Sequence, residues 1–201
     1  NIRVLVVGCG NMGASHAMAY KMLDGVEICG IVSTGSSKEV LNQKLGGGYP
    51  LYNEYDEALE ATQPDAVCIS TYPDTHEQFA ILALEKGCHV FIEKPLADSV
   101  SGAERVAAAA KKAGKKLVVG YILRHHPSWE KFIELARQVG KPLVMRMNLN
   151  QQSHGLMWNV HRNLMKSLSP IVDCGVHYID VMCQMVRSKP VQVTAIGARL
   201  T

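Results

Sequence analysis

A glycine pattern close to the start constrains this chain more than any other feature. Residues 8–13 read G-x-G-x-x-G and follow directly after the β-branched run Ile2–Val7. Gly8 permits a tight turn, Gly10 lets the backbone approach a pyrophosphate, and Gly13 lets a following helix pack closely on the strand. The start of that helix offers free N–H groups to an anion. Because the pattern follows the first strand of a series, it predicts a dinucleotide-binding turn, although alone it would also fit a plain strand-to-helix turn.

Strands and helices alternate from this turn to about residue 120. The strand-like runs are 2–7, 26–32, 66–70, 89–92 and 116–119, and the helical runs are 11–23, 36–45, 55–61, 75–86 and 99–113. Alternation at this pitch indicates βαβ units around a mostly parallel sheet. The expected fold class is α/β, with a doubly wound Rossmann sheet in residues 1–120.

The pattern changes after residue 120. Residues 143–150 alternate between apolar and polar side chains, which is typical of a half-exposed antiparallel strand. A helix is expected over 170–186 and another strand over 191–200, so residues 121–201 predict the start of an α+β domain with an open sheet. Two strands and one helix would close a core poorly. We therefore expect the native protein to continue beyond Thr201, and the isolated piece to lack full activity.

Composition excludes some classes of partner. Hydrophobic residues make up 47% and charged residues 19% of the chain, and the net charge of +3 is too small to indicate nucleic acid or a membrane surface. No apolar run is long enough to span a bilayer. The cysteines form no C-x-x-C pair, so buried reduced thiols are favoured over a metal site or disulfides. Reduced thiols favour a cytoplasmic location. The six cysteines are Cys9, Cys29, Cys68, Cys88, Cys174 and Cys183.

The end of the second strand bears on the choice of cofactor. An NAD-binding turn places an acidic residue about 20 residues after the glycines, where it binds the ribose hydroxyls. Here Ser33, Thr34 and then Lys38 occupy that stretch. Hydroxyls and an ammonium group could receive the 2′-phosphate of NADP, which favours NADP modestly over NAD. A solvated serine-rich turn without any preference is the alternative.

Further motifs follow in a fixed order. His16 comes three residues after Gly13, Ser-Thr-Tyr-Pro at 70–73 precedes His76, E-K-P stands at 93–95, and D-x-G-x-H-x-x-D spans 173–180. In this combination the chain resembles the glucose–fructose oxidoreductase / inositol dehydrogenase / rhizopine catabolism (Gfo/Idh/MocA) family over essentially its whole length. The resemblance implies a Rossmann domain followed by an open-sheet domain through which members form homo-oligomers, here a dimer or tetramer.

The resemblance also implies an activity, namely hydride transfer between a nicotinamide and a secondary alcohol or ketone of a sugar or polyol. Lys94 follows a buried strand, where parallel sheets place their ligands. Asp173 and His177 are four residues apart on an expected helix, so both would lie on one face. We expect His177 to be the general base or acid and Lys94 to stabilise the alkoxide. Asp173 is expected to hold the substrate and to tune the other two groups. A solvated lysine and a helix-surface ion pair are the structural alternatives.

Two other functions stay open, namely a non-catalytic dinucleotide-binding regulator and an NAD-dependent glycosidase. A regulator would be expected to lose Lys94 or His177, and this chain keeps both. Candidate substrate-binding residues are Tyr121, Arg124, Trp158 and His161. The candidate cofactor-binding residues are Gly8, Gly10, Asn11, Met12, Gly13, Ser33, Thr34, Lys38, Thr71, Tyr72, Pro73, His76, Glu93 and Lys94.

Overall fold

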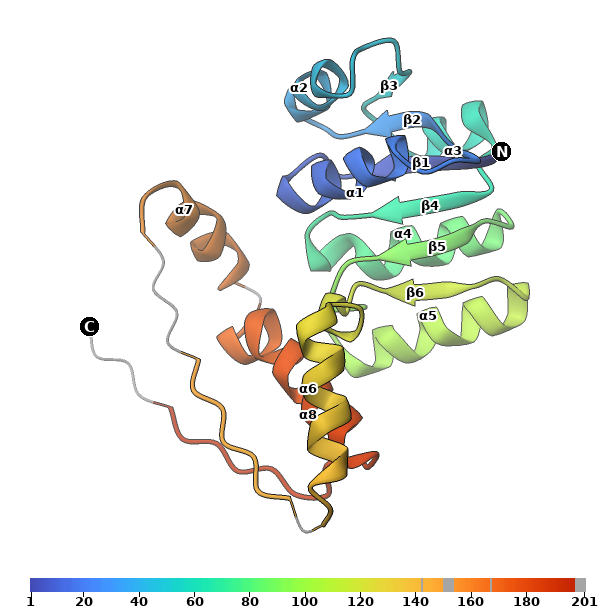
Figure 1. Cartoon of the computed structure of the whole chain (residues 1–201). Coiled ribbons are helices and arrows are strands. Elements are labelled where there is room, and N and C mark those ends of the chain that lie inside the picture. The colour runs from blue at the N-terminus through green and yellow to red at the C-terminus, as the bar shows by residue number, and fades with distance from the viewer. Residues whose placement is uncertain (142, 150–153, 167, 198–201) are drawn as a thin grey trace.

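A computed structural model describes residues 1–141, 143–149, 154–166 and 168–197 (Figure 1). Its first part alternates strands and helices, and its second part is helical. The elements of the first part are β1 (Ile2–Val7), α1 (Asn11–Lys21), β2 (Val26–Val32), α2 (Ser37–Lys44), β3 (Leu51–Tyr52), α3 (Tyr55–Thr62), β4 (Ala66–Ile69), α4 (Pro73–Glu85), β5 (His89–Ile92), α5 (Val100–Ala113) and β6 (Leu117–Val119). The second part contains the 3₁₀ turn η1 (Ile122–Arg124), α6 (Pro127–Gln138), α7 (Gly155–Leu164), the π-helical turn η2 (Ile171–Gly175) and α8 (Val176–Val186).

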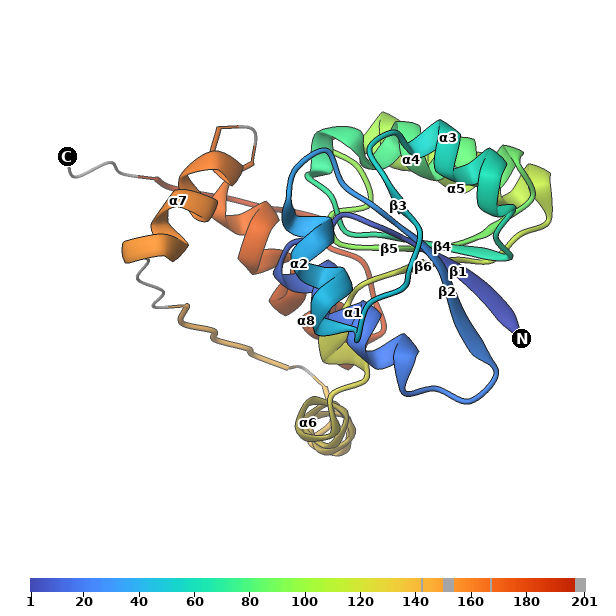
Figure 2. The same cartoon turned by 90° about the horizontal axis from the view of Figure 1, so that it is seen from above.

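The strands form one parallel sheet in the order β3-β2-β1-β4-β5-β6. Helices α3, α4 and α5 cover one face, and α1 and α2 cover the other (Figure 2). This is the doubly wound arrangement, so the predicted α/β Rossmann fold is confirmed. From β1 the chain runs outward to β3 and returns to β4. The strand order therefore reverses between β1 and β4, where open α/β sheets bind their ligands.

The sheet is buried on both faces, as its continuous apolar strands predict. On one face, Leu5 and Ile69 pack with Leu84 of α4. On the other face, Val6 and Ile31 join a cluster with the buried side of α1 and α2. Burial of such side chains stabilises the fold by about 1.5–3 kcal/mol each, and it makes the sheet a rigid support for the loops at its edge.

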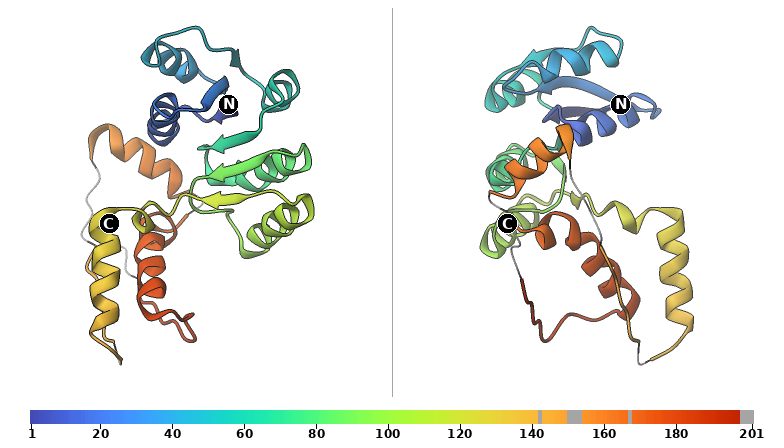
Figure 3. Two further views of the ribbon diagram at one scale, coloured as in Figure 1. Left: turned by 45° about the vertical axis from the view of Figure 1, so that its right-hand side comes forward. Right: turned by 90° about the vertical axis from the view of Figure 1, so that its left-hand side faces the viewer.

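Most predicted bounds in the first part agree with the structure to within two residues, but several elements were not predicted. The two-residue strand β3 is too short to give a pattern. Helix α6 was also not predicted, although its sequence has a helical pattern. Its apolar residues follow helical spacing after Pro127, namely Trp129, Phe132, Ile133 and Ala136. Ile133 packs against α8, and the two helices lie side by side (Figure 3).

The predicted strands of the second part are wrong within the described residues. Residues 143–149 and 191–197 form no strand, although Leu143, Met145 and Met147 are less exposed than Val144, Arg146 and Asn148. A strand requires a neighbour to pair with, and alternation alone does not supply one. The open sheet implied for oligomerisation is therefore not formed in this part of the chain. Residue 150 and residues 198–200 of the predicted strands lie outside the described residues.

Three of the six cysteines are buried, as the apolar stretches around them predict. Cys29, Cys68 and Cys88 are buried, and burial raises the pKa of the Cys68 thiol to about 11. These thiols therefore pack as small apolar side chains and stay protonated. Within the described ranges, no helix combines the length and the apolar character that a membrane crossing needs.

Candidate active site

The parallel strands bring their carboxyl ends to one edge of the sheet, where the predicted site residues lie (Figure 1). Gly8 follows β1, Ser70 follows β4 and Glu93 follows β5. The Ser70 N–H donates to the carbonyl of Val7 at 2.8 Å, and the Glu93 N–H donates to that of Ile69 at 2.9 Å. These hydrogen bonds hold the strand ends in register. The loops that carry the candidate residues consequently begin from fixed positions.

The glycine turn has the shape that a pyrophosphate requires. Gly8 has φ +91°, and a Cβ there would lie 2.5 Å from the carbonyl oxygen of Ser70. A Cβ on Gly13 would overlap the carbonyl oxygen of Gly8, so only glycine lets α1 start this close to β1. A Cβ on Gly10 would meet nothing within 4 Å. Open space over Gly10, with Asn11 and Met12 exposed at the start of α1, fits an anion at a helix N-terminus.

The turn after β2 is built from hydroxyl groups. The Oγ atoms of Ser33 and Ser37 are 2.9 Å apart, and Thr34 is exposed. The Lys38 side chain is buried instead of extended into solvent, and its Nζ donates to the carbonyl of Gly35 at 2.9 Å. Lys38 therefore stabilises the turn, and its expected contact with a 2′-phosphate would require the side chain to leave this position.

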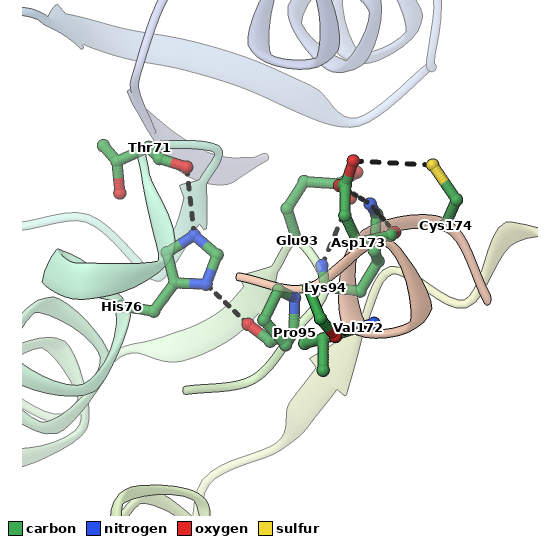
Figure 4. Close-up of polar contacts among 9 residues, drawn as sticks. Thr71, His76, Glu93, Lys94, Pro95, Val172, Asp173 and Cys174 are labelled. Carbon is green, nitrogen blue, oxygen red and sulfur yellow. Dashed lines mark hydrogen bonds and ion pairs between the residues drawn. The ribbon is translucent and has the colours of Figure 1, made fainter. Parts of the chain in front are cut away.

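A buried histidine joins the loops after β4 and β5 (Figure 4). His76 is fully buried, with Nδ1 2.7 Å from the carbonyl oxygen of Pro95 and Nε2 3.1 Å from that of Thr71. With both ring nitrogens occupied, His76 positions the loops, and the expected direct contact with a cofactor does not fit its burial. Tyr72 is exposed and Pro73 is buried at the start of α4, so in this loop the Tyr72 side chain is the one that faces solvent.

Lys94 and Asp173 form an ion pair between the two parts of the chain (Figure 4). Lys94 Nζ lies 3.0 Å from Asp173 Oδ1 and also donates to the Asp173 carbonyl oxygen. Both side chains are largely buried, with 19% of the lysine and 10% of the aspartate side chain exposed. Asp173 Oδ2 accepts a hydrogen bond from the Cys174 thiol at 3.4 Å. The lysine at the end of β5 is thus a fixed, charge-paired group and not a solvated one.

The expected pairing of Asp173 with His177 is not observed. Residues Ile171–Gly175 form a π-helical turn before α8, and this turn directs Asp173 to Lys94. Asp173 therefore has Lys94 as its charged partner, and no hydrogen bond or ion pair joins it to His177 within the described residues. Gly175 lies in the turn, and the atoms nearest to a Cβ there would belong to the Ile171 side chain, at 3.4 Å and beyond.

His177 is the second titratable group of the site. Burial lowers its pKa, the positive charge of Lys94 lowers it further, and these effects outweigh the nearby carboxylates. The ring is therefore neutral at neutral pH and able to accept a proton. Its Nδ1 is buried and lacks a hydrogen-bond partner among the described residues. A buried ring nitrogen without a partner is costly to the fold, which is a common feature of functional sites.

Two of the four candidate substrate residues lie beside His177. The rings of Tyr121 and His177 meet edge to face with centroids 6.3 Å apart. The Arg124 guanidinium lies 5.3 Å from the Tyr121 ring centroid and pairs with both carboxylate oxygens of Asp180, one turn along α8. Asp180 is therefore ion-paired with Arg124.

The other two substrate candidates lie on α7. Trp158 is 47% exposed, and the side chain of neither Trp158 nor His161 makes a hydrogen bond, ion pair or ring contact within the described ranges. Helix α7 lies on the side of the sheet to which the strand ends point (Figures 1 and 2). Its position fits a wall of the site, but no hydrogen bond, ion pair or ring contact joins the Trp158 or His161 side chain to Lys94 or His177 in the described part of the chain.

Comparison with known proteins agrees with this geometry. Residues 2–121 match the profile of an oxidoreductase family with an NAD-binding Rossmann fold. The chain belongs to the Gfo/Idh/MocA oxidoreductase family. It is 31% identical over 169 residues to a 4-carboxy-2-hydroxymuconate-6-semialdehyde dehydrogenase from a Sphingobium strain, which covers 80% of this chain and 54% of that enzyme. It is 29% identical over 194 residues to an inositol 2-dehydrogenase/D-chiro-inositol 3-dehydrogenase from Shouchella clausii, which covers 90% of this chain and 52% of that enzyme.

A solved family structure supports the same assignment. A 3-ketoreductase from Actinomadura kijaniata, in complex with TDP-benzene and NADP, is 28% identical and superposes with a TM-score of 0.62 over 68% of this chain and 43% of its own. The chain spans about half the length of the relatives it matches. Residues 2–121 therefore form an NAD(P)-binding Rossmann fold that carries the glycine turn and Lys94.

Proposed function

We propose that the protein transfers a hydride between NAD(P) and a secondary alcohol or ketone of a sugar, polyol or related small molecule. The observation that carries the proposal is the convergence of Lys94, Asp173 and His177 at the carboxyl edge of the sheet, beside the glycine turn. The names of the relatives favour this chemistry, because they include dehydrogenases of inositol and a 3-ketoreductase.

Each side chain has a role in this proposal. When bound, the nicotinamide would accept or supply the hydride. His177, neutral and partly buried, would take the hydroxyl proton in oxidation and return it in reduction. The Lys94 ammonium would hydrogen-bond the same oxygen and stabilise its negative charge. Asp173 would hold Lys94 in place and balance its charge, while Tyr121 and Arg124 would contact the other hydroxyl groups of the substrate.

The dinucleotide would lie along the edge between β1 and β4. Gly8, Gly10 and Gly13, with Asn11 and Met12, would hold its pyrophosphate, and Ser33 and Thr34 would meet its adenosine ribose. Thr71, Tyr72 and Pro73 would lie along the nicotinamide riboside, with Lys94 nearby. This arrangement follows the strand ends as the structure places them.

The proposed preference for NADP is testable at Ser33, which stands where NAD-specific folds have an acid. Ser33→Asp should repel a 2′-phosphate and shift the preference toward NAD, and the ratio of the two dissociation constants measures the shift. Ser36→Asp, at an exposed residue of the same turn, is the control for added charge. A wild-type preference for NAD of about tenfold, or 1.4 kcal/mol, would argue against the proposal.

A pH prediction follows from the charges around His177. Asp173 raises the imidazole pKa, and it also neutralises Lys94, which lowers that pKa. Asp173→Asn should therefore lower the pKa of His177, so the acidic limb of kcat/KM for alcohol oxidation should move to lower pH. Asp24→Asn, at an exposed carboxylate on the loop before β2, is the control. An acidic limb that moves to higher pH in Asp173→Asn, or one that moves equally in Asp173→Asn and Asp24→Asn, would refute the charge assignment.

The proposed activity is tested with the full-length protein and a panel of polyols, sugars and keto-sugars. Each compound is offered with NAD(H) and NADP(H), and turnover is followed at the nicotinamide absorbance. We expect at least one carbinol or ketone to support sustained turnover. Absence of turnover across the panel, with normal dinucleotide binding, would favour a regulatory protein that only senses the dinucleotide.

Two further proposals concern the whole protein. A homo-oligomer remains a prediction from the family resemblance, and light scattering of the full-length protein would measure its size. The six reduced thiols favour the cytoplasm as its location.

A further inference from the structure

A second histidine, His16, contacts the loop that follows β5 and carries Lys94, here called the lysine loop (residues 93–95). His16 lies on α1, three residues after Gly13, and its Nε2 is 2.8 Å from Glu93 Oε1. The ring meets Phe91 of β5 edge-on, with centroids 4.7 Å apart. Only 18% of the His16 side chain and 8% of the Glu93 side chain are exposed. The contact thus ties the start of α1 to the end of β5 in a largely dry environment.

Glu93 continues this connection to Lys94. Its second oxygen, Oε2, accepts a hydrogen bond from the backbone N–H of Lys94 at 3.2 Å. Burial opposes ionisation of the carboxyl group, but the hydrogen bond and charge of His16, together with the Lys94 N–H and its charge, outweigh burial and hold its pKa below the usual range. The carboxylate is therefore ionised at neutral pH, and both of its oxygens are engaged.

Backbone packing fixes the carboxylate on its other side. A Cβ on Gly120 would lie 3.1 Å from the carboxyl carbon and from both oxygens of Glu93. Gly120 directly precedes Tyr121, the first of the candidate substrate residues. The Glu93 carboxylate thus occupies a fitted position between α1, the lysine loop and the chain segment that leads to the substrate residues.

We propose that His16 and Glu93 are positioning residues that fix the backbone of Lys94, so that its ammonium group points at Asp173 and the reacting oxygen. Neither residue needs to touch the substrate, and Glu93 is accordingly reassigned from the expected cofactor contact. This inference rests on the proposed function where it concerns turnover. The geometry it assigns to Lys94 can be measured without turnover.

The test compares His16→Leu with His16→Gln in the full-length protein. Glutamine can still donate a hydrogen bond to the Glu93 carboxylate, whereas leucine leaves this buried carboxylate without its partner. His89→Leu is the matched control, because His89 lies at the opposite end of β5, where its Nδ1 accepts from the Lys116 N–H. All variants are examined for thermal stability, dinucleotide affinity, turnover and the NMR signal of ¹³Cε-labelled Lys94.

In His16→Leu we expect kcat to fall by about tenfold or more, the scale of a lost hydrogen bond to a charged group. The KM for the dinucleotide should change by less than about threefold, because the glycine turn is intact. The Lys94 signal, assigned with Lys94→Arg, should move toward those of exposed lysines. His16→Gln should restore both the signal and kcat to near wild type, and His89→Leu should leave both unchanged.

Two results would overturn the proposal. One is a Lys94 signal that His16→Leu leaves at its wild-type position. The other is an equal loss of stability and activity in the leucine and glutamine variants, which would make His16 a packing residue only. Because the NMR signal does not depend on any substrate, a failure of the proposed reaction would be recognised separately.

Discussion

Replacement of His177 or Lys94 by alanine in the full-length protein is expected to reduce turnover by about 100-fold or more, the usual scale for a lost general acid–base group. His177 is the neutral, partly buried ring of the site, and burial is the main cause of its lowered pKa. Lys94 is the cation at the end of β5, and without it the charge on the reacting oxygen would lack a stabilising partner. We expect Lys94→Ala to reduce turnover at least as much as His177→Ala.

Controls separate chemistry from folding. Lys94→Ala leaves the buried Asp173 carboxylate without its ion pair, which can itself destabilise the fold. Lys94→Gln keeps a hydrogen-bond donor for Asp173 without the charge, so it should lose turnover while melting close to wild type. His89→Ala and Lys116→Ala, at the far end of the sheet, should keep normal turnover. Near-normal turnover in both His177→Ala and Lys94→Ala would refute the assignment.

Gly13→Ala is expected to cause the largest structural effect of any change in the glycine turn. The new methyl group would overlap the Gly8 carbonyl oxygen and lie 2.9 Å from its carbonyl carbon. These are backbone atoms at the end of a buried strand, so α1 would have to move away from β1. Overpacking of this kind costs about 3 kcal/mol of the free energy of unfolding. Dinucleotide binding should be lost with it, because the N–H groups at the start of α1 move as well.

Gly10→Ala is the matched control for this change. Gly10 has φ −71°, which any residue adopts, and a methyl group there would meet nothing within 4 Å. This variant should melt like wild type but bind the dinucleotide more weakly, since the methyl group enters the space over the turn. Calorimetry with and without dinucleotide measures both effects. Equal melting temperatures for the Gly13 and Gly10 variants would show that the packing of α1 on β1 is not the constraint.

The parallel sheet could be predicted because its determinants are local. The strands that were predicted are short, mostly apolar runs, and a turn residue can mark their end, as Gly8 does after Ile2–Val7. Helix ends were similarly marked, for example by Ser99, whose Oγ accepts from the Gly102 N–H at the start of α5. Within the described residues 143–149 and 191–197 the expected strands are not formed, because strand formation depends on a paired neighbour, which no local pattern supplies.

The candidate site could be predicted as a set of residues but not as a set of contacts. Strand ends place Lys94 correctly, because parallel strands end at one edge. The partner of Asp173 could not be predicted, because Lys94 lies 79 residues away in the sequence and no local pattern links the two. The connection of His16 to Glu93 spans 77 residues. His16 stands in the family pattern, yet nothing in the spacing reveals its partner.

Transfer of deuterium from a labelled carbinol to the nicotinamide would show the proposed hydride transfer itself. The full-length protein is given a polyol deuterated at the reacting carbon together with the oxidised dinucleotide, and both products are examined by mass spectrometry. We expect one deuterium in the reduced nicotinamide, a ketone without the label, and no transfer in His177→Ala. A dinucleotide that stays oxidised while the polyol is unchanged, or a label that returns to a hydrolysed glycoside without net reduction, would contradict it.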